Sequence, residues 1–184
     1  MQTIAIVTGN PGKLRELEAM AMGKLDFEMK PLHLHEIQSL DLEEIVKDKL
    51  ERAYAELKTP VIVDDVSAGL DDLKGLPGPF IKFFNDKLTE ESLYILAGHK
   101  EAPVTIVCLA AYYDGTTMLI GKGTIHGKVV SPRGENGFGF DVVVMPDGES
   151  RTMAEMTAEE KMMISHRGQA FRDLLAQIEK LPRT

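Results

Sequence analysis

The sequence has little cysteine, no excess of positive charge and no long apolar segment. Cys108 is the only cysteine, which excludes an intrachain disulfide. The apolar residues 104–111 around it indicate a buried thiol in a protein of the reducing cytoplasm. A formal net charge of -8 argues against binding to nucleic acid or to an anionic membrane surface. Ile4–Val7, the apolar run near the N-terminus, is far too short for a signal peptide or a membrane span. An anionic ligand would therefore need local cations or a metal.

The remaining composition is that of a folded protein. The 184 residues are 43% hydrophobic and 27% charged, which predicts one domain over residues 1–184. Apolar runs at residues 3–7, 61–63 and 104–113 predict strands, and Asp114-Gly115 predicts a hairpin turn after the last of them. Helical patterns start near residues 11, 41, 81, 157 and 166, with capping signals at Asp41 and at Thr157 followed by Glu160. We expect an α/β fold around a mixed central sheet with flanking helices.

The first strand runs into a glycine-containing turn, Thr8-Gly9-Asn10-Pro11-Gly12-Lys13. A helix that starts here would bring backbone N–H groups, the positive end of its dipole and the Lys13 ammonium together, which suits a phosphate. The turn is not a Walker A loop, because Gly9 and Gly12 are too close together and Leu14 stands where a metal-binding hydroxyl would be. An ordinary capped helix start explains the same residues.

Two adjacent acids, Asp64 and Asp65, follow the strand at residues 61–63. In extended backbone their side chains point to opposite faces, so at most one of them enters a given cleft. A Mg²⁺ site usually combines one or two carboxylates with water and substrate phosphates, so a second acid such as Glu36 would be needed. The alternative is that both acids simply solvate the end of a strand.

Two further segments carry polar and aromatic groups that suit a purine base. The glycine-rich residues 134–141 bring Phe138 and Phe140 near Asp141, where they could stack on a base and hydrogen-bond to it, or could instead anchor the core. His166 and Arg167 follow Ser165 at a helix start and could donate hydrogen bonds into a pocket or face solvent. Other candidate phosphate ligands, which could equally be surface cations, are Lys49, Lys82, Lys161 and Arg133.

Four of these segments, in this order, resemble the inosine triphosphate pyrophosphatase family over most of the chain. They are Thr8 to Lys13, Leu76-Pro77-Gly78-Pro79-Phe80-Ile81-Lys82, Phe138-Gly139-Phe140-Asp141, and Glu160-Lys161 followed by Ser165-His166-Arg167. The resemblance implies an elongated, two-lobed α/β fold with a cleft, assembled as a homodimer. It also implies hydrolysis of non-standard purine nucleoside triphosphates (ITP, dITP and XTP) to the monophosphate and pyrophosphate.

The resemblance also assigns roles to residues. Thr8, Gly9, Asn10, Pro11, Gly12, Lys13 and Lys161 would hold the phosphates, with Lys49 and Lys82 as further cationic contacts. Glu36 and Asp65 would bind Mg²⁺, for which Mn²⁺ could substitute. Asp65 is the first candidate for the general base and Asp64 the second. Phe138, beside Gly139 and Phe140, would stack on the purine, Asp141 would meet its Watson–Crick edge, and His166 and Arg167 would donate to a 6-oxo group.

Three features depart from the family pattern, one of which is a residue inserted between Glu36 and the helix that carries Lys49. Val66 stands where the family commonly has Ser or Thr, and Met162 replaces an Asn. These departures leave two alternatives open beside the main hypothesis. The first is a nucleotide-binding protein with weakened catalysis, and the second is a pyrophosphatase of pyrimidine or other modified triphosphates.

Overall fold

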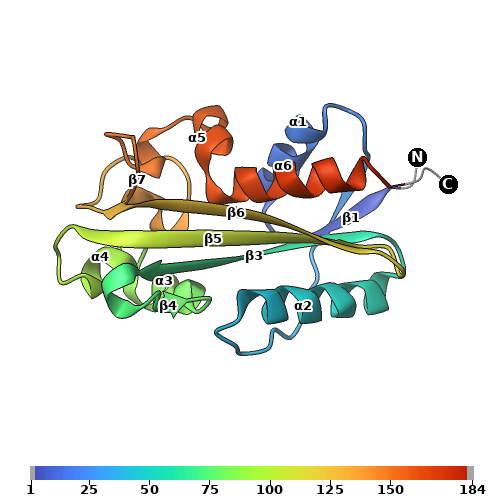
Figure 1. Ribbon diagram of the computed structural model, residues 1–184, viewed down its shortest axis with the longest axis horizontal. Coiled ribbons are helices and arrows are strands. Elements are labelled where there is room, and N and C mark those ends of the chain that lie inside the picture. Colours follow the sequence, from blue (N-terminus) through green and yellow to red (C-terminus); the bar gives the residue numbers. More distant parts are fainter. Residues whose placement is uncertain (1–2, 182–184) are drawn as a thin grey trace. The chain divides into compact units, whose positions relative to one another are not determined.

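The computed structural model describes residues 3–181 (Figure 1). The helices are α1 (Pro11–Ala21), α2 (Leu42–Leu57), α3 (Ile81–Leu88), α4 (Ser92–Leu96), α5 (Ala158–Ile164) and α6 (His166–Ile178). The strands are β1 (Ile4–Val7), β2 (Phe27–Lys30), β3 (Val61–Leu70), β4 (Pro77–Gly78), β5 (Ala102–Tyr113), β6 (Met118–Val129) and β7 (Val144–Pro146). Three short 3₁₀ helices, η1 (Asp71–Leu73), η2 (Gly139–Val142) and η3 (Met153–Glu155), complete the fold.

The strands form one mixed sheet. Their order is β2-β1-β3-β5-β6-β7, and β4 pairs with β3. Strand β1 runs parallel to both β2 and β3, whereas β3 pairs antiparallel with β4 and β6 pairs antiparallel with β7. The predicted α/β fold with a mixed sheet and flanking helices is confirmed. The turn at Asp114-Gly115 also forms as expected, because the Asp114 carboxylate accepts from the backbone N–H groups of Thr116 and Thr117.

The predicted domain comprises two compact units. Unit 1 contains the residues up to Asp65, Cys108–Gly123 and the residues from Arg167 on; unit 2 contains Val66–Val107 and Thr124–His166. The buried core of unit 2 includes Leu70, Leu93, Ile106, Val144 and Met153. Strands β3, β5 and β6 contribute residues to both units, so each unit is built from segments far apart in the sequence.

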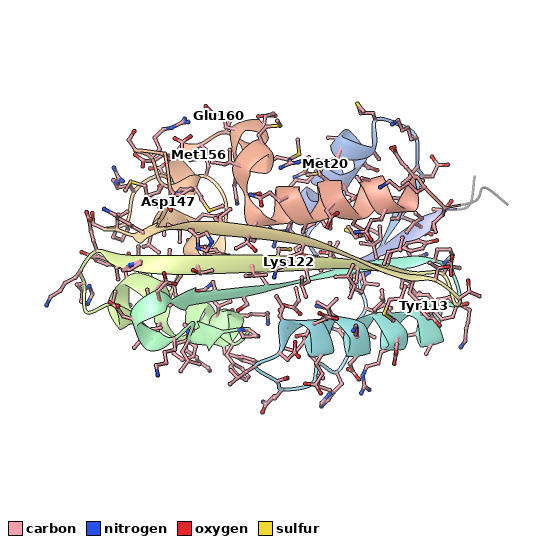
Figure 2. All side chains as sticks on the ribbon, viewed as in Figure 1. Met20, Tyr113, Lys122, Asp147, Met156 and Glu160 are labelled. Atoms are coloured by element: carbon pink, nitrogen blue, oxygen red, sulfur yellow. The ribbon has the colours of Figure 1, made fainter. Side chains whose placement is uncertain are left out.

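Unit 1 places helices on both faces of its strands. In Figure 1, α1 and α6 lie on one side of the strands and α2 on the other. Helix α6 packs so closely on β6 that a Cβ at Gly121 would meet the backbone of Ala170 and Leu174. On the α2 side, Tyr113, which Figure 2 labels, meets Tyr54 edge to face with 4.9 Å between ring centroids. The two faces of the unit 1 strands therefore meet different helices.

Strand β3 is longer than the sequence indicated. The predicted strand ended at Val63, but β3 continues to Leu70 and places Asp64 and Asp65 in its interior. Strand β2 was not predicted, because Phe27–Lys30 is only partly buried and carries two charged side chains. Within residues 3–181, no helix combines the length and the apolar character that crossing a membrane requires.

We expect the Cys108 thiol to resist modification until unit 1 unfolds. Its side chain is fully buried, and burial, with Asp64 adding to the effect, raises its thiol pKa far above the ordinary value. Because the thiolate is the reactive form, an aromatic disulfide reagent at pH 8 should titrate less than about 0.1 thiol per chain in buffer and one in denaturant. Full labelling of the folded protein within minutes would contradict this burial.

Candidate functional site

The turn after β1 has the geometry that the sequence predicted. Asn10 caps α1 by accepting from the backbone N–H of Gly12 at 2.8 Å, and Pro11 is the first helical residue. The Thr8 hydroxyl accepts from the backbone N–H of Asn10 at 3.0 Å, which tightens the turn before the cap. These bonds fix the start of α1, so Lys13 leaves the first turn of the helix at a defined position.

Asp64 is the centre of a buried cluster of charges in unit 1. Asp64 is only 4% exposed, although a carboxylate is rarely buried. Both of its oxygens accept from the Lys13 ammonium, at 2.8 and 2.9 Å, and Oδ2 also accepts from Arg167 Nε at 3.1 Å. Lys13 comes from α1, Asp64 from β3 and Arg167 from α6. The cluster thus joins three elements that are distant in sequence.

The two cations keep Asp64 ionised. Burial alone would raise the pKa of this carboxyl, but the charges of Lys13 and Arg167 outweigh burial and hold the pKa well below its usual range. Arg167 gains in return, since Asp64 offsets the effect of burial on the guanidinium and raises its pKa. The Asp64 carboxyl is therefore ionised at neutral pH.

Asp65 points away from this cluster and meets α2. Its carboxylate lies 3.3 Å from the ammonium of Lys49, and the same ammonium lies 2.7 Å from Glu36 Oε1. Burial opposes the charge on Lys49, but Asp65 and Glu36 outweigh it and raise the lysine pKa. The prediction that the two adjacent acids serve opposite faces is confirmed, because Asp64 and Asp65 pair with different cations on different helices.

The residues around Lys49 fit a divalent cation. Glu36 and Asp65 share one ammonium as partner, so their oxygens converge on one point that already favours positive charge. Oxygen ligands of this kind suit Mg²⁺, which typically takes one or two carboxylates and completes its shell with water and substrate phosphates. In the described part of the chain, no group of three or more His, Cys, Asp or Glu residues forms a metal cage. Glu36 and Asp65 are thus the oxygen donors that this site offers to such an ion.

Unit 2 holds a second cluster, in which Asp141 organises a loop. Its carboxylate accepts from the backbone N–H of Phe138 at 2.8 Å and from the ammonium of Lys161. The Lys161 ammonium also lies 4.5 Å from the centre of the Phe138 ring, within the range of a cation–π contact. Asp141 and Lys161 are both buried. Together they fix the backbone of the loop and the position of the Phe138 ring.

Helix α5 carries Lys161 and begins as predicted. Thr157 and Glu160 form a capping box, in which each side chain accepts from the other residue's backbone N–H. Glu160, labelled in Figure 2, also pairs with Arg151 at 3.0 Å. The first turn of α5 is thus fixed at its N-terminus, directly before the lysine that meets Asp141.

The two phenylalanines of the loop have different environments. Phe140 is 8% exposed and belongs to the core of unit 2, whereas Phe138 is 41% exposed. The buried ring of His166 lies 6.0 Å from that of Phe140, measured between centroids. Phe140 therefore takes the role of core anchor that the sequence left open, and Phe138 is the ring that a base could reach.

The remaining candidates lie apart from these contacts or have other partners. Lys82 has a side chain that is 77% exposed and meets Asp86 at 3.5 Å on the surface of unit 2. Arg133 approaches Glu155 and the carbonyl of Ser150. Val66 packs against the core of unit 2, as a valine in a strand is expected to do.

Two contacts were not apparent in the sequence. Arg167, which is predicted to donate to a base, binds Asp64 through its Nε, 103 residues earlier in the chain. Glu90 accepts from the backbone N–H of Gly139 at 3.2 Å and so supports the loop of Phe138. Neither contact has a local signal, because each joins residues that only the folded chain brings together.

Known proteins share both the sequence and the fold. The sequence pattern of the Ham1 family matches residues 4–177. An inosine triphosphate pyrophosphatase of Yarrowia lipolytica is 41% identical over 176 residues, which cover 94% of this chain and 93% of the relative. The structure of a HAM1 protein from Coxiella burnetii is 25% identical with a TM-score of 0.82 and covers 98% of this chain and 100% of its own. The Staphylococcus aureus Ham1 protein is 27% identical with a TM-score of 0.81, and the match covers 97% of this chain and 98% of that one. With a family match over nearly its whole length, this chain belongs to the Ham1 family.

Proposed function

We propose that the protein hydrolyses non-standard purine nucleoside triphosphates, namely ITP, dITP and XTP, to the monophosphate and pyrophosphate. The observation that carries the proposal is the charge cluster of unit 1, where Lys13 and Lys49 accompany the carboxylates of Asp64, Asp65 and Glu36. Such a set suits a polyphosphate and a divalent cation in a protein whose net charge is negative. The name of the Yarrowia lipolytica relative supports the same substrate class.

The phosphates would be held at the start of α1. The turn Thr8 to Lys13 offers the positive end of the helix dipole, and the Lys13 ammonium lies in the first turn of that helix. Lys49 supplies a second cation from α2. These groups offset the charge of the triphosphate and stabilise the charge that develops on the leaving pyrophosphate.

Glu36 and Asp65 would hold Mg²⁺, for which Mn²⁺ can substitute. When bound, this ion neutralises phosphate charge and lowers the pKa of a coordinated water. Lys49, which pairs with both carboxylates, would turn toward the phosphates when a cation takes its place.

Asp65 would also act as the general base. A water oxygen attacks the α-phosphorus while the bond to the β-phosphate oxygen breaks, pyrophosphate departs, and Asp65 takes the water's proton. The Asp65 side chain is 22% exposed, so water can reach it, whereas Asp64 is buried between two cations. The exposure difference favours Asp65 over Asp64 for this step.

The base would be recognised by the loop of unit 2. The exposed ring of Phe138 offers a stacking surface, and Asp141 and Lys161 hold it in place. The oxygen at C6 of hypoxanthine or xanthine accepts hydrogen bonds where adenine presents an amino donor. A donor such as His166 would pair with the former and be left unsatisfied by the latter, which is how such sites reject an analogue.

The proposal is tested by pyrophosphate release from ITP, XTP, ATP, GTP and dTTP, with Mg²⁺ and after its removal by EDTA. We expect turnover that requires the metal, with kcat/KM for ITP and XTP at least about 100-fold above that for ATP. Tight binding of ITP without release would show a nucleotide-binding protein instead. Preferred turnover of dTTP would show a pyrimidine pyrophosphatase.

Replacing the proposed base should abolish turnover without unfolding the protein. Asp65→Asn keeps the volume of the side chain but removes a metal-binding charge and the proton acceptor, so kcat should fall by about 10²–10⁴-fold. Asp48→Asn on α2 is the matched control, because the Asp48 carboxylate pairs with Arg52 one turn along the same helix, at 2.6 Å. Near-normal kcat in Asp65→Asn, with a melting temperature like that of the control, would assign the base elsewhere.

The two phenylalanines should respond differently to truncation. Phe138→Ala removes the stacking surface and should raise KM for ITP by about 10- to 100-fold, with little change in melting temperature. Phe140→Ala opens a cavity in the core of unit 2 and should lower stability by about 3–5 kcal/mol. Steady-state kinetics and thermal melts of both variants separate the roles. An unchanged KM in Phe138→Ala would rule out stacking on this ring.

Three further properties stay predictions. The resemblance implies a homodimer and a contact of Lys82 with substrate, and the single buried thiol indicates the reducing cytoplasm. Exposed apolar side chains on unit 2, those of Leu73, Leu76 and Phe83, supply surface that a second copy could cover.

A further inference from the structure

We propose that Asp64 acts as a positioning residue that holds Lys13 and Arg167 in their working geometry, and that it takes no proton during the reaction. This inference rests on the proposed hydrolysis, since it assigns Asp64 a part in that chemistry. It separates the roles of two adjacent acids that the sequence alone could only rank.

The contacts of Asp64 are those of a positioning residue. Oδ1 accepts from Lys13 at 2.8 Å, while Oδ2 accepts from Lys13 at 2.9 Å and from Arg167 Nε at 3.1 Å. Both oxygens are thus committed to cations, and the side chain is 2% exposed. A base needs an oxygen that can approach a water molecule, whereas the hydrogen bonds of this carboxylate are directed toward Lys13 and Arg167.

The Asp64 carboxylate restricts the conformation of the Lys13 side chain. This side chain has four rotatable bonds, and fixing them costs rotamer entropy. The two bonds to Asp64 fix the ammonium at the first turn of α1 before any phosphate arrives. Preorganised charges of this kind stabilise a transition state without reorganising during the reaction.

Asp64 also positions Arg167, which lies at the start of α6. Arg167 is buried, it binds Asp64 through Nε, and it follows His166 directly in the chain. The carboxylate therefore holds the side chain of the residue that directly follows the proposed purine donor. Loss of Asp64 should disturb discrimination between ITP and ATP as well as the rate.

A double-mutant cycle tests whether Asp64 acts through Lys13. We expect Asp64→Asn and Lys13→Met each to lower kcat/KM for ITP by about 100-fold or more, and the double variant to lose less than about a further 10-fold beyond the worse single variant. Asp64→Glu, which keeps the charge, should recover part of the loss. If the losses instead multiply, so that Asp64→Asn costs as much without Lys13 as with it, the inference is overturned.

The double-mutant cycle can also be carried out if the Asp64→Asn variant does not fold. In that case Asp64→Glu replaces it in the cycle with Lys13→Met, because the longer side chain displaces the carboxylate without burying an unpaired cation. The expected outcome is again a loss that shrinks in the Lys13→Met background. A loss of equal size in both backgrounds overturns the inference here too.

An NMR readout separates this inference from the proposed function. The Nε–H signal of Arg167 is assigned by its absence in Arg167→Lys, and it should be shifted or lost in Asp64→Glu or Asp64→Asn but kept in Asp65→Asn, the matched neighbour. If no triphosphate is hydrolysed, the proposed function fails while this signal still reports the positioning contact. If the signal is unaffected by replacing Asp64, the positioning role fails whatever the activity.

Discussion

A buried carboxylate cannot remain ionised without partners, and this requirement governs how unit 1 is assembled. Removing a carboxylate from water costs several kcal/mol unless cations and hydrogen bonds compensate. Asp64 on β3 obtains that compensation from Lys13 on α1 and Arg167 on α6, which lie near opposite ends of the sequence. The N-terminal turn and the C-terminal helix must therefore meet β3 in one arrangement, and the residues that satisfy the buried charge are also those proposed to meet the substrate.

The alternation of side chains along β3 divides the chemistry between two adjacent acids. Asp64 pairs with Lys13 on α1 and Arg167 on α6, while Asp65 pairs with Lys49 on α2. One carboxylate is buried and committed to cations, and the other keeps access to water and lies near Glu36. Adjacent residues with the same side chain thus acquire different environments, because successive positions in a strand point to opposite faces.

In unit 2, a buried ion pair positions an aromatic ring. Asp141 accepts from the loop backbone and from Lys161, and the ammonium of Lys161 lies over the ring of Phe138. Phe140, two residues along, anchors the loop in the core. A buried ion pair and a buried ring therefore hold an exposed ring rigidly, and a rigid stacking surface binds a base with less loss of entropy than a mobile one.

The sequence by itself determined the α/β class, the capped starts of α1, α2 and α5, the turn at Asp114-Gly115 and the family. These features could be predicted because the periodicity of apolar residues, the capping residues and the spaced motifs are local properties of the chain. It also showed that Asp64 and Asp65 must face opposite ways. Only the tertiary structure decided which acid is buried, that Arg167 binds Asp64, that Lys161 binds Asp141, and which phenylalanine is exposed. These outcomes depend on contacts between residues up to 103 positions apart, and the burial that sets the cost of each charge exists only after those residues have packed.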